Sequence, residues 1–142
     1  MRFKLQFNPN FKLATDPKTH PETLALLARD TIDDIRLEVT EHPNMLPETL
    51  AFLARDNYCS VRWNVARDSR TPPESLAFLA QDESSNVRDE VAGNPNTPPE
   101  ILTLLAQDKN ASVRCGVERN PNATREVIQT VRAYEFYSEC AA

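Results

Sequence analysis

Apolar residues recur along this chain in a pattern that repeats every 26 residues. Each unit opens with a proline followed by a glutamate, at Pro21, Pro47, Pro73 and Pro99, and we number repeat positions from this proline. Positions 4, 7 and 8 are Leu, Leu and Ala in all four units, and position 6 is Leu or Phe. At about 100° per residue these positions cover more than half of a helix, so we expect it to be packed on several sides. A fixed period of this size predicts stacked helical repeats.

A second helical segment follows in each unit, after an aspartate at position 10 and a polar turn. Its signature is Val-Arg-x-x-Val-Ala, seen at 87–92, which places two branched residues on one helical face. We expect this segment to be the shorter helix of the pair, in either α or 3₁₀ geometry. The predicted N-caps are Ser60, Asn86 and Ser112, with Asp34 in the first unit.

The start of the first helix has the pattern of a capping box, with threonine two residues before the repeat proline and glutamate after it. Met45 replaces the threonine in the second unit. No histidine or nucleophile column accompanies the glutamates, so helix capping is favoured over acid–base catalysis. The residues concerned are Thr19 and Glu22, Glu48, Thr71 and Glu74, and Thr97 and Glu100.

The chain is predicted to form a single domain of repeats with a cap at each end. The four full repeats are 21–46, 47–72, 73–98 and 99–124. Residues 1–20 look like a half-repeat that caps the N-terminal end, and a positively charged interaction arm is the alternative. Within them, Phe3, Leu5 and Phe7 alternate with polar residues, as in a short extended segment.

Residues 125–142 begin as a fifth helix and depart from the repeat afterwards, as expected of a more polar terminal cap. Arg132 replaces the usual alanine and Tyr134 replaces the usual aspartate. Tyr134, Phe136 and Tyr137 either pack on the last repeat or form an exposed aromatic tail, and packing is favoured.

The unit A-x-N-P-N-T-P-P-E-x-L-x-x-L-A-x-D-x(4)-V-R-x-x-V-A, best seen at 92–117, resembles the leucine-rich repeat variant (LRV) family. Its Asp-x(5)-Arg spacing is similar to that of HEAT-like repeats. The resemblance covers roughly residues 13–128. It implies an all-α, right-handed solenoid of about four and a half units, each with a longer α-helix and a short α or 3₁₀ helix. It also implies binding rather than a defined reaction, so we expect no enzyme activity.

Cofactors and metals are not expected. One LRV family member carries an iron–sulfur cluster on N-terminal cysteines, whereas this chain has no cysteine before Cys59. Cys59, Cys115 and Cys140 lack metal-like spacing and are interpreted as reduced thiols. His20 and His42 have no cysteine or acidic cluster beside them.

Composition narrows the classes of partner. The 142 residues include 21 acidic and 16 basic ones, for a formal net charge of −5, which disfavours dominant phosphate binding. Only two glycines are present, which argues against glycine-rich phosphate loops. Neither a secretory signal nor a membrane-spanning run is visible, so the predicted location is the cytoplasm.

Aspartate at position 10 and arginine at position 16 recur together in every unit. The arginine flanks the buried valine face, where an unpaired charge would be costly, so a structural ladder is favoured over a charged row for a ligand. The ladder would link the two helices of a unit or adjacent units. Its members are Asp30 and Arg36, Asp56 and Arg62, Asp82 and Arg88, and Asp108 and Arg114.

The varied face of the second helix is the predicted binding surface. Position 17 holds Leu37, Trp63, Asp89 or Cys115, and position 21 changes similarly. Because Trp and Arg are the commonest interface anchors, Trp63 and Arg67 are the main candidates, extended by Leu37 and Tyr58. The alternative is that Trp63 lies flat against a neighbouring repeat.

The predicted function is a non-catalytic repeat scaffold that binds a protein or peptide of unknown identity. A nucleic-acid-binding helical solenoid and a homo-oligomeric structural protein are the alternatives.

Overall fold

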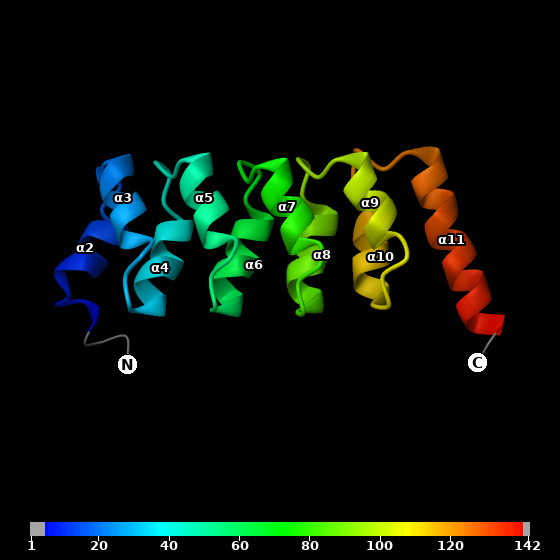
Figure 1. Ribbon diagram of the computed structural model, residues 1–142, viewed down its shortest axis with the longest axis horizontal. Coiled ribbons are helices and arrows are strands. Elements are labelled where there is room, and N and C mark those ends of the chain that lie inside the picture. The colour runs from blue at the N-terminus through cyan, green and yellow to red at the C-terminus, as the bar shows by residue number, and fades with distance from the viewer. Residues whose placement is uncertain (1–4, 141–142) are drawn as a thin grey trace. The chain divides into compact units, whose positions relative to one another are not determined.

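A computed structural model of the chain describes residues 5–140, with side chains described as far as Tyr134, and this part is built of helices α2 to α11 without strands (Figure 1). The fold class is therefore an all-α helical-repeat solenoid, as the sequence predicts. The chain divides into two compact units, one up to Val65 and one from Ala66 onward. We describe each unit by itself.

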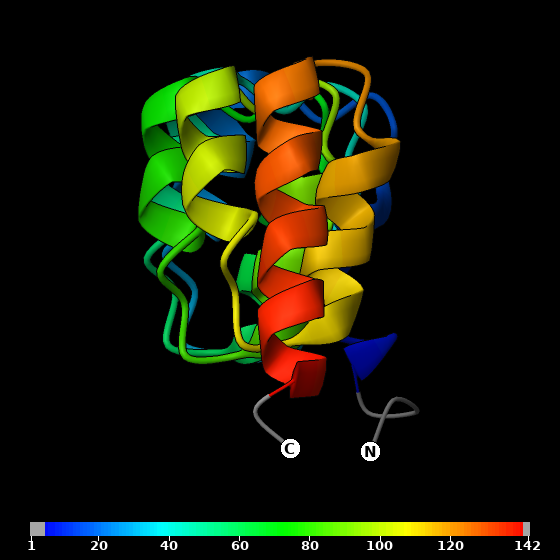
Figure 2. The ribbon, with the colours of Figure 1, turned by 90° about the vertical axis from the view of Figure 1, so that its right-hand side faces the viewer.

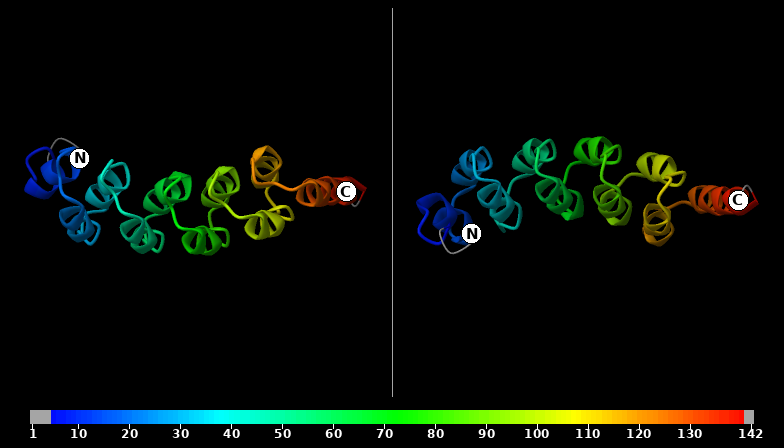
Figure 3. Two further views of the ribbon diagram at one scale, coloured as in Figure 1. Left: turned by 90° about the horizontal axis from the view of Figure 1, so that it is seen from above. Right: turned by 90° about the horizontal axis from the view of Figure 1, so that it is seen from below.

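In the first unit, α4 packs against α2, α3 and α5. Figure 3 shows α3 and α5 in one row and α4 in a second. The unit boundary falls inside the last helix. The helices are α2 (Pro9–Thr15), α3 (Pro21–Leu27), α4 (Asp33–Thr40), α5 (Pro47–Leu53) and α6 (Cys59–Arg67).

In the second unit, α8 packs against α7, α9 and α10. The C-terminal helix lies along both α9 and α10 and covers that end of the unit (Figure 2). The helices are α7 (Pro73–Leu79), α8 (Ser85–Gly93), α9 (Pro99–Leu105), α10 (Ala111–Arg119) and α11 (Arg125–Cys140).

The core of both units consists of the same repeat positions. Positions 4, 7 and 8 of the first helix are buried in every repeat, as are the two branched residues at positions 15 and 19 of the second helix. Leu50 and Leu53 in the first unit, and Leu76 and Leu79 in the second, are fully buried. Each such leucine contributes about 1.5–3 kcal/mol by leaving water.

The relative lengths of the paired helices differ from the expectation. The first helix of each pair has seven residues, whereas the second has eight or nine and is α-helical. The first helix ends after two turns because the chain bends into the turn that holds the position-10 aspartate. The predicted order of lengths was wrong, and of the two geometries considered for the second helix the structure has the α-helix.

The predicted capping boxes are absent from the four first helices, whose N-caps are His20, Leu46, Pro72 and Pro98, without side-chain capping hydrogen bonds. Each helix begins at the proline of position 1, so its N-cap lies one residue after the threonine position predicted as the cap. The buried threonine instead donates a hydrogen bond to a carbonyl in the last turn of the preceding helix. The Thr19 hydroxyl donates to the Leu13 carbonyl, and the Thr97 hydroxyl donates to the Val91 carbonyl, both at 2.6 Å.

The second helices also begin earlier than predicted, so Asp34, Ser60, Asn86 and Ser112 lie inside them. The position-10 aspartate explains the early start, because its carboxylate accepts the backbone N–H two residues later and closes the turn. These hydrogen bonds join Asp30 to Ile32, Asp56 to Tyr58, Asp82 to Ser84, and Asp108 to Asn110.

A ladder of side-chain amides joins neighbouring repeats at the turn after the second helix. Asn94 donates to the Asp68 carbonyl, and Asn120 donates to the Asn94 carbonyl, each at 2.9 Å and 26 residues back. Buried His42 makes the same contact with the Asp16 carbonyl in the first unit. The sequence alone does not reveal this role between repeats, because asparagine is also common in turns.

At the chain ends, Leu5 is helical, and Gln6 and Phe7 form a turn, so the predicted extended segment is wrong for these residues, while Phe3 lies outside the described part. At the other end, Val127 and Val131 of α11 are buried. Tyr134 is half-buried, and the side chains of Phe136 and Tyr137 lie outside the described residues.

Candidate functional site

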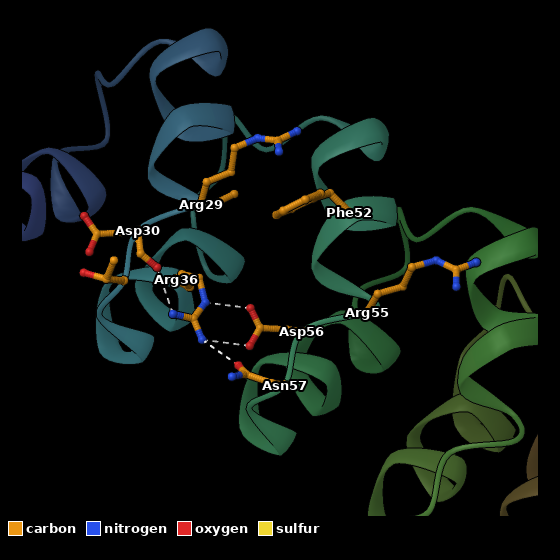
Figure 4. A pocket seen from close by; sticks show the side chains of 9 residues that line it. Arg29, Asp30, Arg36, Phe52, Arg55, Asp56 and Asn57 are labelled. Carbon is orange, nitrogen blue, oxygen red and sulfur yellow. Dashed lines mark hydrogen bonds and ion pairs between the residues drawn. The ribbon is translucent and has the colours of Figure 1, made fainter.

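The structure places Arg36 and Arg88 each between two aspartates. In the first unit, Arg36 donates to the Asp30 carbonyl within its own repeat and to the Asp56 carboxylate of the next repeat (Figure 4). The two contacts with the carboxylate measure 2.7 Å from Nε and 2.9 Å from Nη2. This two-point geometry fixes the guanidinium, and both side chains are almost fully buried.

The second unit repeats this arrangement. Arg88 donates to the Asp82 carbonyl at 2.7 Å and to the Asp108 carboxylate at 2.6 Å and 3.0 Å. Arg62 donates to the Asp56 carbonyl, and Arg114 donates to the Asp108 carbonyl, both at 2.9 Å. The arginines therefore join helices to one another, and Arg36 and Arg88 use their Nε, Nη1 and Nη2 atoms for contacts within the protein.

The carboxylates of the two bidentate pairs are held in their ionised form. Burial raises the pKa of Asp56, but hydrogen bonds from Arg36 and the Tyr58 amide, with the charges of Arg36 and Arg62, hold this pKa below its ordinary 3.8. Asp108 shows the same balance between burial and its arginine. Both aspartates therefore keep their negative charge at neutral pH.

The C-terminal helix changes the last step of the ladder. Tyr134 occupies position 10, and the guanidinium carbon of Arg114 lies 5.0 Å from the centre of its ring. The cation–π contact takes the place of the carboxylate contact seen in the bidentate pairs. Tyr134 thus packs on the last repeat.

The first-helix residues at position 6 are exposed, which corrects the expectation that this helix is packed on several sides. The exposed fractions are 72% for Leu26, 43% for Phe52, 41% for Phe78 and 55% for Leu104. The neighbouring positions 4, 7 and 8 are buried, so each first helix buries one face and leaves an apolar residue outside. Hydrophobic pattern alone does not reveal which side of a helix lacks a neighbour.

An open hollow lies beside Phe52 in the first unit (Figure 4). It has a volume of about 530 Å³, and its lining comes from residues 28–31, Arg36, Phe52 and residues 55–57. The guanidinium of Arg29 lies 4.2 Å from the centre of the Phe52 ring. We call this the Phe52 hollow. Its volume falls within the range of about 300–1,000 Å³ found for ligand sites.

The residues predicted to bind a partner do not gather in this hollow. Tyr58 is exposed and lines a smaller hollow with Asp33, Arg36 and Asn57. Leu37 and Trp63 are half-buried in the first unit, and neither lines the two hollows named here. Arg67 is exposed and belongs to the second unit.

The side chains described by the structure include no group of three or more His, Cys, Asp or Glu residues that could hold a metal ion. Cys59 and Cys115 are exposed free thiols, and the side chain of Cys140 lies outside the described part. Among the described helices, none is long and apolar enough to cross a membrane.

Comparisons with known proteins agree with the repeat pattern. A family model described as the Leucine Rich Repeat Variant domain matches residues 61–121. A solved structure described as a leucine-rich repeat variant with a novel repetitive protein structural motif is similar, with a TM-score of 0.66 and 24% sequence identity over 94% of this chain. The chain spans 60% of that protein's length. A search of curated proteins finds no match. The resemblance to the leucine-rich repeat variant family is thereby confirmed, and the family match covers residues 61–121.

Proposed function

We propose that this chain is a non-catalytic repeat scaffold that binds a protein or peptide. The observation that carries the proposal is the exposed apolar residue at position 6 of all four first helices, Leu26, Phe52, Phe78 and Leu104. Isolated exposed leucines are ordinary on protein surfaces, but recurrence at one structural position supports a shared use.

The residue at position 6 lies outside the buried core of each unit. The buried positions 4, 7, 8, 15 and 19 already supply the contacts between helices. An apolar side chain at position 6 gains about 25 cal/mol for each Å² that a partner covers. Two of the four residues are phenylalanines, and aromatic side chains provide large contact areas at little conformational cost.

The varied face of the second helices is a second candidate surface for the same function. In the first unit it comprises Leu37, Tyr58 and Trp63, with Arg67 as a candidate in the second unit, and its support is the change of residue type at positions that do not serve the core. Tyr58 is the most exposed aromatic residue of the four. The effects of Phe52→Ala and Trp63→Ala on peptide binding distinguish the position-6 residues from this surface.

Selection of peptides from a random displayed library, with the purified chain as bait, tests the proposal. Peptides are expected to be enriched and to bind the wild type measurably by fluorescence anisotropy, with binding lost in Phe52→Ala and retained in Trp63→Ala. Loss in Trp63→Ala alone would move the site to the second-helix face. Failure to enrich any binding peptide would contradict the proposed function.

A further inference from the structure

The Phe52 hollow allows the proposed binding function to be made chemically specific, and the inference below rests on that function. Its carboxylates are already occupied by donors from the protein. The Asp56 oxygens accept from Arg36 and from the Tyr58 amide. The Asp30 oxygens accept from the Asn10 side chain at 2.6 Å and the Ile32 amide at 2.9 Å. A ligand therefore meets few open acceptors here.

The lining of the hollow also includes donor groups. Arg36 donates at 3.1 Å to the Asn57 Oδ1 atom. Because a guanidinium only donates, this contact assigns the oxygen to the Arg36 side and leaves the Asn57 Nδ2 group pointing the other way. Figure 4 shows the Asn57 nitrogen directed away from Arg36. The exposed Thr31 hydroxyl also belongs to the lining.

The Arg29 guanidinium adds a cation beside an apolar surface. Its contact with the Phe52 ring at 4.2 Å covers part of that ring and holds the charge next to the hollow, with no carboxylate bound to it among the described residues. Ala28 and the exposed part of Phe52 supply apolar surface next to this charge. An anionic group and a hydrophobic group that are neighbours in one ligand would fit this combination.

The equivalent surface of the second unit lies 52 residues further along and lacks these features. We call it the Leu104 surface; it comprises residues 80–83, Arg88, Leu104 and residues 107–109. It has Gln81 in place of Arg29 and Leu104 in place of Phe52. The lining of the Phe52 hollow has three cations and two carboxylates, a formal charge of +1, whereas the Leu104 surface has two cations and three carboxylates, a formal charge of −1.

We infer that the Phe52 hollow binds an acidic peptide segment that carries a hydrophobic side chain next to its carboxylates. Arg29 binds a carboxylate of the peptide, and Phe52 packs against the hydrophobic side chain. The occupied lone pairs of Asp30 and Asp56, together with the positive lining in an otherwise acidic chain, favour an acidic ligand over a basic one.

The test uses a fluorescein-labelled peptide of alternating Asp and Glu residues with one central Leu, and fluorescence anisotropy at low and physiological ionic strength. Two companion peptides replace the acidic residues with Asn and Gln or with Lys. The acidic peptide is expected to bind best, to weaken with salt, and to lose about tenfold in affinity in Arg29→Gln. The matched control Gln81→Asn in the second unit is expected to bind like the wild type.

Three other results would contradict the binding of an acidic peptide. Equal affinity of the acidic peptide for Arg29→Gln and the wild type would overturn the inference. Preference for the neutral or basic peptide, with binding lost in Phe52→Leu, would overturn the inference and leave the proposed function standing. A single-stranded oligonucleotide that binds through Arg29 more tightly than the peptide would also overturn it. Because Arg29 is exposed, unchanged thermal unfolding of Arg29→Gln is expected to show that the fold is intact.

Discussion

The Phe52 hollow and the Leu104 surface have equivalent buried ion pairs but differ in their exposed residues. Arg36 and Asp56 form the interior of the hollow, and Arg88 and Asp108 make the same two-point contact beneath the Leu104 surface. Among the exposed residues, Arg29 and Phe52 of the hollow are replaced by Gln81 and Leu104 in the Leu104 surface. The comparison indicates that the ladder positions hold the repeats together, while positions 6 and 9 are available to distinguish one repeat from another.

The largest expected effect on stability comes from removing the arginine of a buried ion pair. Arg36→Ala and Arg88→Ala are each expected to lower the free energy of unfolding by about 3 kcal/mol, because a buried aspartate loses its partner. Urea denaturation followed by circular dichroism measures the loss. Arg70→Ala is the control, since Arg70 pairs with Asp68 at a more exposed site and is expected to cost about 0.5 kcal/mol. Equal losses in all three variants would contradict a structural ladder.

A substitution at position 18 of the last repeat is expected to have a smaller effect on stability, confined to the second unit. The first unit has Asn64 here, which donates to the Thr40 hydroxyl at 2.7 Å, whereas the second unit has Gly116. A Cβ atom on Gly116 would lie 2.9 Å from the Ala92 Cβ, so Gly116→Ala is expected to cost about 2 kcal/mol.

Gly93→Ala is the matched control for this close approach of α8 and α10. No atom lies within 4 Å of its added Cβ, and the residue is helical, so the variant is expected to gain about 0.5 kcal/mol. Thermal unfolding of the two variants should therefore shift in opposite directions. Shifts of the same sign would show that α8 and α10 approach less closely than described.

Low pH is expected to reduce the stability of both units, because each contains a buried aspartate–arginine pair. Folded Asp56 and Asp108 have pKa values below the ordinary 3.8, so their stabilising contribution is present above that pH and is lost as the pH falls below it. Urea midpoints measured from pH 7 to pH 2.5 should fall most steeply at the acid end. A midpoint that stays constant through this range would contradict the ionised pairs.

Much of the repeat architecture could be predicted because stacking imposes the same buried residues on every unit. The leucines at positions 4 and 7 and the branched residues at positions 15 and 19 recur for this reason, and the structure buries them. Arg36 and Arg88 were assigned a structural role from their place beside the buried valine face. The sequence left open whether the ladder links the two helices of one unit or adjacent units, and the structure shows carboxylate contacts with the next repeat.

The candidate site could not be predicted, because exposure depends on where neighbouring helices lie. Phe52 has the hydrophobicity of a core residue, and only the packed structure shows that no helix covers it fully. The contact of Arg29 with Phe52 joins two repeats, and the pattern within one repeat does not reveal it. The amide ladder of Asn94 and Asn120 was missed because asparagine is also the ordinary residue of turns.

Transfer of the Phe52 hollow to the second unit tests the central claim most directly. The variant carries Gln81→Arg, Glu83→Thr, Leu104→Phe, Gln107→Arg and Lys109→Asn, which gives the Leu104 surface the same lining residues as the hollow. Isothermal titration with the acidic peptide is expected to show one site in the wild type and two sites of similar affinity in the variant. A single site in the folded variant would contradict the claim that the lining residues at positions 6, 9 and 11 determine what each surface binds.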